Sequence, residues 1–240
     1  MMKPMKSISD KINEAFKNGS HEQIKDLLVY SDRGEYLQDC KLSGESWDIA
    51  VIHDDDIAVV TQPLQQSIQF INVKTMTAGS ILYVPGDCYY ICIANDTICV
   101  GGYQVYLYIV NKHGERLKTV MLPDSGSIDY IHHGLYDRLY YIDNTRNCVT
   151  CVNMEGHVRF RYTSKDLKLL RRVITDKEGN MYLASNNSNT IQRLTPNLEF
   201  LDVIPNDGNV IGMVFGYDCP KLFVLNQVKN STFLLSFICS

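Results

Sequence analysis

The stretch MYLAS at 181–185 is one of five short apolar segments that recur along the chain at nearly equal distances. The other four are IAVVT at 57–61, ICVGG at 98–102, LYYID at 139–143 and LFVLN at 222–226. Their starting positions lie 41, 41, 42 and 41 residues apart. A fixed period of this length indicates a repeat architecture, in which each unit buries its faces only against its neighbours.

Each aligned segment is flanked by further strand-like segments. An apolar run and a polar turn precede it in most repeats. A loop and a third apolar run follow it, at 68–71, 107–110, 149–152, 191–194 and 233–236. Fourth runs begin after turn residues, most clearly at 116–122 and 198–204. Four strands in a repeat of about 40 residues predict an all-β chain, a β-propeller of four-stranded blades with five clear repeats.

The two ends of the repeat region predict how the ring closes. The fifth repeat reaches residue 240 without a fourth strand, whereas 34–42 begins with GEYL and matches the GERL that opens the fourth strand at 114–117. We therefore expect 34–42 to pair with 233–238, which would remove an exposed sheet edge. An alternative is that 24–30 and the residues after Gly34 form strand, turn and strand, so that a sixth blade is present in part.

Residues 1–30 depart from the repeat. Apolar side chains from Ile8 to Phe16 fall at helical spacing and predict a short helix. The expected domains are a helical or irregular segment over 1–30 and a propeller over 31–240.

Composition is that of a soluble folded chain. Of the 240 residues, 45% are hydrophobic and 21% charged, which indicates neither disorder nor a membrane partner. No apolar core follows the lysines of the first ten residues, so a secretory signal is not indicated. The eight cysteines stand singly in apolar runs, as reduced buried thiols do. These features predict a cytoplasmic location.

The fourth repeat resembles a known family. VITDKEGNMYLASNNSNTIQRLTPNLEFL at 173–201 is similar to an NHL repeat, through Asp176, Gly179, Asn180, Tyr182 and Ile191. The span 34–239 resembles the NHL-like propeller of invertebrate tripartite-motif proteins, without their RING, B-box and coiled-coil regions. The resemblance implies a six-bladed ring, here with an incomplete N-terminal blade. It also implies a module that recognises a protein substrate or signalling partner, or single-stranded RNA.

Cysteine and histidine pairs are the first candidates for site chemistry. Cys148 and Cys151 form a C-x-x-C, but residues three apart in a strand point to opposite faces. His132 and His133 diverge in the same way, and one of them is expected to pack or hydrogen-bond internally. We expect no metal, cofactor or catalytic residue here.

An aspartate run at 54–56 is the other candidate. It would suit a calcium-dependent propeller hydrolase, but such sites need six to eight oxygens arranged in space. A tight turn explains the run, because an aspartate side chain forms hydrogen bonds with nearby main-chain groups.

The third repeat, DRLYYIDNTRNCVTCVNMEG, also resembles the YWTD repeats of extracellular receptor propellers. Both remain alternatives to a non-enzymatic scaffold that has no small-molecule substrate.

Charged residues divide between the two ends of the predicted ring. Loops after the second and fourth strands share one end, and those after the first and third share the other. The first end is predicted to be a basic binding face that carries Arg146, Lys165, Lys168, Arg171, Arg172, Lys229 and the ring of Tyr103. The second collects Asp96, Asp137, Asp176 and the run at 54–56. A protein partner is the first expectation for the basic face, and single-stranded RNA is the second.

Overall fold

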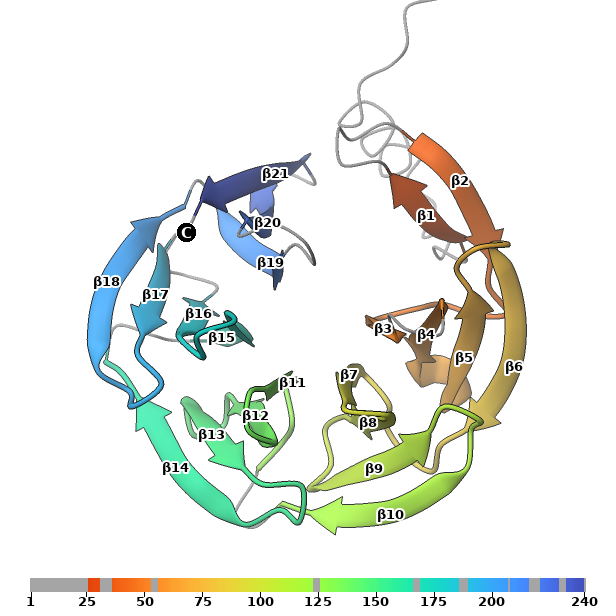
Figure 1. Cartoon of the computed structure of the whole chain (residues 1–240), viewed down its shortest axis with the longest axis horizontal. Helices are drawn as coiled ribbons and strands as arrows, with labels where there is room; N and C mark the ends of the chain where they lie inside the picture. Colours follow the sequence, from red (N-terminus) through yellow and green to blue (C-terminus); the bar gives the residue numbers. More distant parts are fainter. Residues whose placement is uncertain are drawn as a thin grey trace, which may run out of the picture.

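The computed structural model describes residues 26–30, 36–52, 56–122, 126–165, 169–185, 190–206, 208–215, 221–228 and 232–239. Within these residues the strands form six antiparallel sheets arranged around a ring, as Figure 1 shows. One short 3-10 helix, η2 (Pro63–Gln65), lies between two strands. The predicted all-β propeller is confirmed. The helix predicted from Ile8 to Phe16 lies outside the described residues.

Four of the sheets are complete blades of four strands. The first holds β3 (Ile49–Ile52), β4 (Ile57–Gln62), β5 (Ser67–Asn72) and β6 (Thr77–Tyr83). The second holds β7 (Tyr90–Ala94), β8 (Thr97–Gly101), β9 (Tyr106–Asn111) and β10 (Arg116–Met121). The third holds β11 (Tyr130–Gly134), β12 (Arg138–Asp143), β13 (Cys148–Val152) and β14 (Val158–Thr163). The fourth holds β15 (Leu170–Thr175), β16 (Met181–Ser185), β17 (Thr190–Leu194) and β18 (Phe200–Pro205). The first strand of each blade lies innermost and the fourth outermost (Figure 1).

Two further sheets are partial. The fifth repeat forms a three-stranded sheet of β19 (Asn209–Phe215), β20 (Lys221–Val228) and β21 (Thr232–Cys239). The N-terminal part contributes a two-stranded sheet of β1 (Asp26–Tyr30) and β2 (Tyr36–Lys41). The described residues thus contain four complete blades, not the five or six expected. Strand β1 also lies inside the segment 1–30 that was expected to be helical or irregular.

The predicted closing pair is wrong for the described strands. Strand β2 pairs with β1, from Asp26 opposite Lys41 to Tyr30 opposite Tyr36, and β21 pairs with β20. Among the described strands no pairing joins β2 to β21. A hairpin between neighbouring strands closes a short loop, whereas the predicted pair would close almost the whole chain at a larger entropy cost. The alternative reading of strand, turn and strand is the one the structure adopts.

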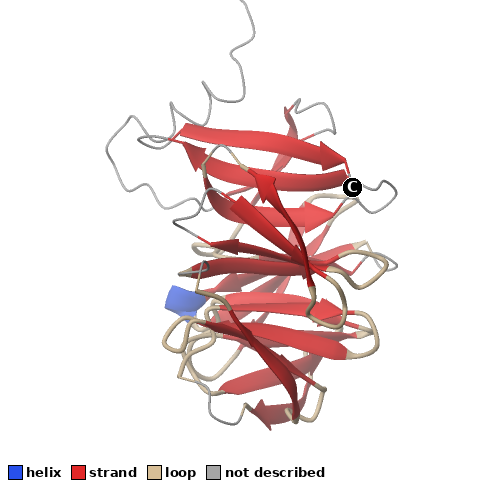
Figure 2. Ribbon diagram, turned by 90° about the vertical axis from the view of Figure 1, so that its left-hand side faces the viewer, coloured by secondary structure: helices blue, strands red, loops and turns tan. Residues whose placement is uncertain are grey.

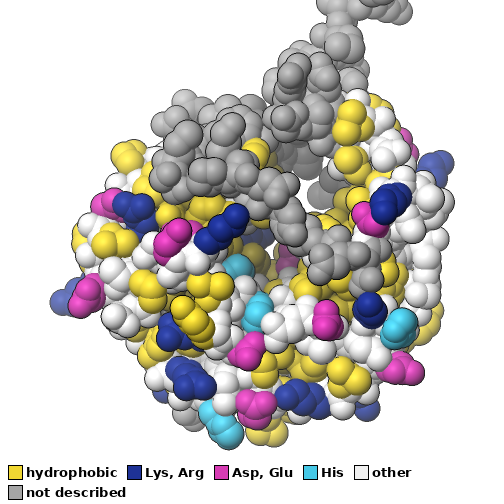
Figure 3. Space-filling view, viewed as in Figure 1, with side chains coloured by type: hydrophobic (Ala, Val, Ile, Leu, Met, Phe, Trp, Pro, Cys, Tyr) yellow, Lys and Arg dark blue, Asp and Glu magenta, His cyan; other side chains and the backbone are white. Residues whose placement is uncertain are grey.

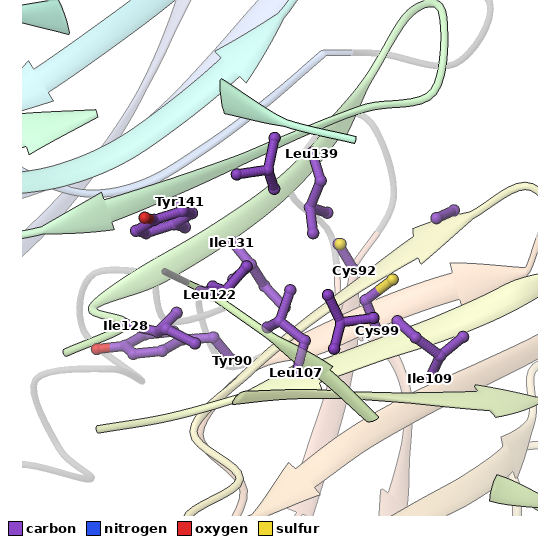
Figure 4. Close-up of a cluster of buried hydrophobic side chains, with 13 residues drawn as sticks. Tyr90, Cys92, Cys99, Leu107, Ile109, Leu122, Ile128, Ile131, Leu139 and Tyr141 are labelled. Atoms are coloured by element: carbon purple, nitrogen blue, oxygen red, sulfur yellow. The ribbon is translucent and has the colours of Figure 1, made fainter. Parts of the chain in front are cut away.

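The core lies between consecutive sheets. One cluster joins Tyr90, Cys92 and Leu107 of the second blade to Ile131 and Leu139 of the third, as Figure 4 shows. Equivalent clusters lie between the first and second blades, between the third and fourth, and between the fourth blade and β19–β21. Each of the second, third and fourth blades therefore buries both faces, which explains the near-continuous apolar second and third strands.

The turns after the third strands are specified by sequence. In the second blade Asn111 Oδ1 accepts hydrogen bonds from the main-chain N–H groups of His113 and Glu115, and Gly114 follows with φ 86°. In the third blade Asn153 accepts from Glu155 and His157 in the same manner. Such side-chain bonds fix the strand ends, so the loops keep their places relative to the sheets.

Candidate partner-binding face

The loops gather at the two ends of the ring, because the strands run from one end to the other (Figure 2). We call one end the Tyr103 face. It is formed by the loops that follow second and fourth strands and by the loop 42–48 that leads into β3, and η2 marks it at the left of Figure 2. The opposite end, formed by the loops after first and third strands, is called the Asp96 face.

The structure brings most of the predicted site residues to the Tyr103 face. Tyr103 lies in the β8–β9 loop and Arg146 in the β12–β13 loop. Lys165 lies between β14 and β15, and Arg171 and Arg172 begin β15 at the same end. Two further predicted residues, Lys168 and Lys229, lie outside the described residues.

An aromatic cluster on this face was missed by the sequence reasoning. Trp47 and Tyr89 lie in the loops directly before β3 and β7, and their rings meet edge to face with centroids 5.4 Å apart. Tyr103 packs on Tyr89 from the next loop, at 4.7 Å. Trp47 and Tyr103 are 58% and 48% exposed. The repeat alignment places both missed residues just before an inner strand, which is the signal that could have found them.

The close packing of two loops holds Tyr103 in place. A Cβ on Gly102 would lie 2.5 Å from the main-chain oxygen of Asp87, and a Cβ on Gly86, which has φ 85°, would overlap the side chain of Gln104. Glycine is therefore required at both positions. The loops 84–89 and 102–105 consequently form one surface.

The inner strands continue this cluster around the opening of the ring on the Tyr103 face, which we call the mouth. Tyr90 faces Gly101, Tyr130 faces Ile142 and Arg172 faces Ala184 in their pairings with the second strands, so the three occupy the same register position in successive blades. The rings of Tyr90 and Tyr130 lie 6.0 Å apart. The guanidinium carbon of Arg172 lies 4.7 Å from the centroid of the Tyr130 ring. Burial raises the pKa of both tyrosines, so they stay neutral.

Asp48 joins the first blade to the second at this mouth. Its Oδ2 accepts a hydrogen bond from the main-chain N–H of Ile91 at 3.1 Å. Burial raises the pKa of the carboxyl to about 6, and the positive charge of Arg172 opposes that rise. The Asp48 N–H donates to Thr61 Oγ1, whose hydroxyl donates to the Tyr89 carbonyl at 3.1 Å. Asp48 therefore fixes the two loops that carry Trp47 and Tyr89.

The charge on the Tyr103 face is divided. Over the first two blades lie the partly buried Glu45, Asp48 and Asp87, together with the aromatic cluster. Over the third and fourth blades lie the predicted basic residues, Arg146, Lys165, Arg171 and Arg172. The face predicted as basic therefore also carries an acidic half.

Two carboxylates in the basic half are committed to the main chain. Asp129 Oδ2 accepts from the N–H of Asn144 at 2.8 Å. Asp143 accepts from the N–H groups of Gly126 and Arg146. Both shape loops, as aspartate does in turns.

The Asp96 face carries both signs of charge and surrounds a hollow at the centre of the ring (Figure 3). A pocket of about 490 Å³ lies there among β3, β7 and β11, with His132 and His133 in its lining. His132 Nε2 accepts a hydrogen bond from the Thr175 N–H at 3.1 Å and lies 3.0 Å from its hydroxyl oxygen. Burial lowers the pKa of His132 to about 3. His132 therefore bonds internally, as one member of the pair was expected to do.

The other sequence candidates have structural roles. Asp176 Oδ1 accepts from the N–H groups of Glu178 and Asn180 in its own turn. Asp56 forms an ion pair with Lys74, and Asp54 and Asp55 lie outside the described residues. Within the described part of the chain, no three His, Cys, Asp or Glu side chains are placed to hold a metal ion.

Buried thiols account for the cysteines that the structure describes with side chains. Cys148 and Cys151 are both free and buried, as are Cys40, Cys88, Cys92 and Cys99. No helix in the described ranges is both long and apolar enough to cross a membrane.

Comparisons with known proteins establish the fold. No protein-family model matches the chain, and no curated protein matches it in sequence. A solved structure of hydrazine synthase from Kuenenia stuttgartiensis is similar with a TM-score of 0.61 and 14% identity, over 83% of this chain and 67% of that one. A functionally unknown protein from Desulfotomaculum acetoxidans is similar with a TM-score of 0.65 and 15% identity, over 90% of this chain and 76% of that one. At these identities the likeness extends to the β-propeller fold alone.

Proposed function

We propose that the chain is a non-enzymatic interaction module that binds a protein partner through the Tyr103 face. The observation that best supports this proposal is the cluster of Trp47, Tyr89 and Tyr103, two of whose rings are about half exposed. Tryptophan, tyrosine and arginine dominate the binding energy of protein interfaces, and Arg172 lies at the same mouth. The rings are fixed by packing, so ordering them on binding costs little entropy.

The proposal includes an NHL-like propeller of the tripartite-motif type and a cytoplasmic location. The similarity of 173–201 to an NHL repeat supports the first, and the six free, buried cysteines support the second. In that setting the partner is a substrate or signalling protein that the module recognises.

Affinity capture with matched variants tests the proposal. The whole chain is immobilised as wild type, as Trp47→Ala/Tyr103→Ala and as Tyr136→Ala, and captured proteins are quantified by mass spectrometry. Tyr136 is the control, because it is 80% exposed but lies in the β11–β12 loop on the Asp96 face. We expect proteins that the wild type and Tyr136→Ala retain and that the double variant loses by more than about tenfold. Equal capture by all three would refute the proposal.

Single-stranded RNA is the second candidate partner. The exposed rings can stack on bases, and Arg146, Lys165 and Arg171 on the same face suit phosphates. Filter binding with an oligouridine tests this candidate at low and raised salt, against a variant with Arg146, Lys165, Arg171 and Arg172 changed to Glu. Affinity that falls steeply with salt and is abolished in the variant would support RNA. Failure to retain RNA at low salt would eliminate it.

A further inference from the structure

The cluster of Trp47, Tyr89 and Tyr103 presents aromatic surface that is held rigidly. Tyr89 is partly buried and contacts both exposed rings, at 5.4 and 4.7 Å. An aromatic ring carries negative charge density on its faces and attracts a cationic side chain laid over it. The geometry therefore offers anchored ring surface to a partner group.

Carboxylates accompany these rings in the same loops. Glu45 and Asp48 flank Trp47 in the loop 42–48, and Asp87 stands two residues before Tyr89. The main-chain oxygen of Asp87 lies against Gly102, beside Tyr103. The Asp48 carboxyl is partly buried, where its Oδ2 accepts the Ile91 N–H and Arg172 brings a positive charge near it. We name the set Glu45, Trp47, Asp48, Asp87, Tyr89 and Tyr103 the acidic aromatic patch.

We propose that the acidic aromatic patch binds a lysine or arginine side chain, presented by an extended segment of a protein partner. This inference rests on the proposed partner-binding function and specifies its chemistry. The cation lies over the ring of Trp47 or Tyr103 and is attracted by the carboxylates of Glu45 and Asp87, while Asp48 fixes the loop that carries Trp47. Rings supply the contact area and carboxylates select the sign of charge.

The charge of the patch favours a cationic peptide over nucleic acid. A base stacked on Trp47 or Tyr103 would bring its phosphates close to the carboxylates, at separations within a Debye length, where like charges repel. Of the basic residues that would suit phosphates, Arg146, Lys165 and Arg171 lie over the third and fourth blades, and Arg172 lies against the ring of Tyr130. Lys41, the exposed last residue of β2, precedes the loop 42–48 in the chain.

The basic half gives the partner segment a direction. Arg146, Lys165 and Arg171 lie across the mouth from the acidic aromatic patch. A segment that crosses the mouth with its cation on the patch would place its acidic residues over these side chains. The face therefore matches a segment that carries opposite charges at its two ends.

Selection from a displayed peptide library tests the inference. The probes are random peptides of about twelve residues, which extend to roughly 40 Å. Selection uses the wild-type chain, and each selected peptide is measured again on Trp47→Ala. Peptides that depend on Trp47 are then synthesised with each lysine acetylated or each arginine replaced by citrulline, which removes the charge and, for citrulline, nearly keeps the shape. We expect one such replacement to weaken binding by about fivefold to thirtyfold.

Protein variants supply the complementary arm. Glu45→Gln/Asp87→Asn removes two charges from the patch and should weaken the same peptides about threefold or more at low salt, with less effect at high salt. Asp96→Asn is the control, because it removes a carboxylate from the opposite face and should leave affinity unchanged. Thermal unfolding of each variant verifies that the fold is kept.

The outcomes separate the inference from the function beneath it. Peptides that require Trp47 but tolerate loss of every cation would overturn the cation site and leave the partner-binding face standing. If no selected peptide depends on Trp47, the inference is overturned. Affinity capture with Trp47→Ala/Tyr103→Ala then shows whether the proposed partner-binding function stands without it. Oligouridine that binds the wild type and is lost on Trp47→Ala would assign the rings to RNA and overturn the inference.

Discussion

His132 gives the fold a pH-dependent stability that a single substitution can isolate. The imidazole lies between β11 and β15, where its Nε2 accepts a hydrogen bond from the Thr175 N–H. Burial lowers its pKa from an ordinary 6.5 to about 3, and the neighbouring His133 contributes in the same direction. On the same strand, His133 Nε2 lies 3.9 Å from a carboxylate oxygen of Asp137. In the folded chain His132 is therefore neutral throughout the mildly acidic range.

The sign of the effect follows from the unfolded state. There the imidazole has its ordinary pKa, so between 6.5 and about 3 the unfolded chain binds a proton that the folded chain does not. The contribution of neutral His132 to the free energy of unfolding is complete above pH 6.5. It is lost as the pH falls, by about 1.4 kcal/mol for each pH unit. At about pH 5 the loss amounts to about 2 kcal/mol, or a fall in melting temperature of about 4 to 8 °C for a chain of this size.

Guanidinium unfolding at about pH 8 and about pH 5 measures the effect in wild type and His132→Gln. The glutamine carbonyl can accept the Thr175 N–H but does not titrate. We expect the wild type to lose about 2 kcal/mol more than the variant between the two pH values. His157→Gln is the control, because His157 is exposed in the β13–β14 loop, and it should keep the wild-type dependence. Identical pH dependence in wild type and His132→Gln would refute the reasoning.

Three further predictions concern a turn, the core and the mouth of the ring. Gly156→Ala should lower the free energy of unfolding about 1 to 3 kcal/mol more than Gly114→Ala, because both have φ 86° but only a Cβ at Gly156 would meet a main-chain oxygen, at 2.5 Å; equal losses in denaturant unfolding would contradict this. Leu139→Ala should cost about 2 to 5 kcal/mol, since that side chain is 1% exposed, whereas Leu64→Ala, at a 68% exposed position, should stay within about 0.5 kcal/mol. Asp48→Asn should become more stable relative to the wild type as the pH rises from about 4 to about 8, by about 1 to 3 kcal/mol in the free energy of unfolding. The raised pKa of about 6 means that ionisation of Asp48 at this buried site disfavours the folded wild type. A constant difference between the two chains would show that burial does not set this pKa.

The repeat period made the fold predictable, because the apolar second strands report burial on both faces. The segments that begin at Ile57, Ile98, Leu139, Met181 and Leu222 all form second strands of their sheets. Strand partners at the ends were less predictable. The segment after Gly34 has the sequence pattern of a fourth strand, and that pattern is compatible with pairing to either β1 or β21. The smaller entropy cost of closing the short loop between β1 and β2 decides between the two pairings, and the composition of the segment does not show this.

The candidate site was predictable in part. Loop position alone placed Tyr103, Arg146 and Lys165 at one end of the ring. Trp47 and Tyr89 were missed because they lie outside the aligned strands, and only the contact between loops of adjacent blades brings them to Tyr103. The prediction of a basic face counted cations and left out Glu45, Asp48 and Asp87, which lie in the loops before inner strands.

The shared register of the inner strands has a consequence for how recognition can change over time. Ile49, Tyr90, Tyr130 and Arg172 occupy one structural position in four successive blades, yet they differ in size, polarity and charge. The hydrogen bonds of each sheet run through main chain and do not depend on which of these side chains is present. The mouth is therefore a circular array of independently exchangeable groups, in which selection can vary one blade's contribution to specificity while the strand pairing that holds it is inherited unchanged.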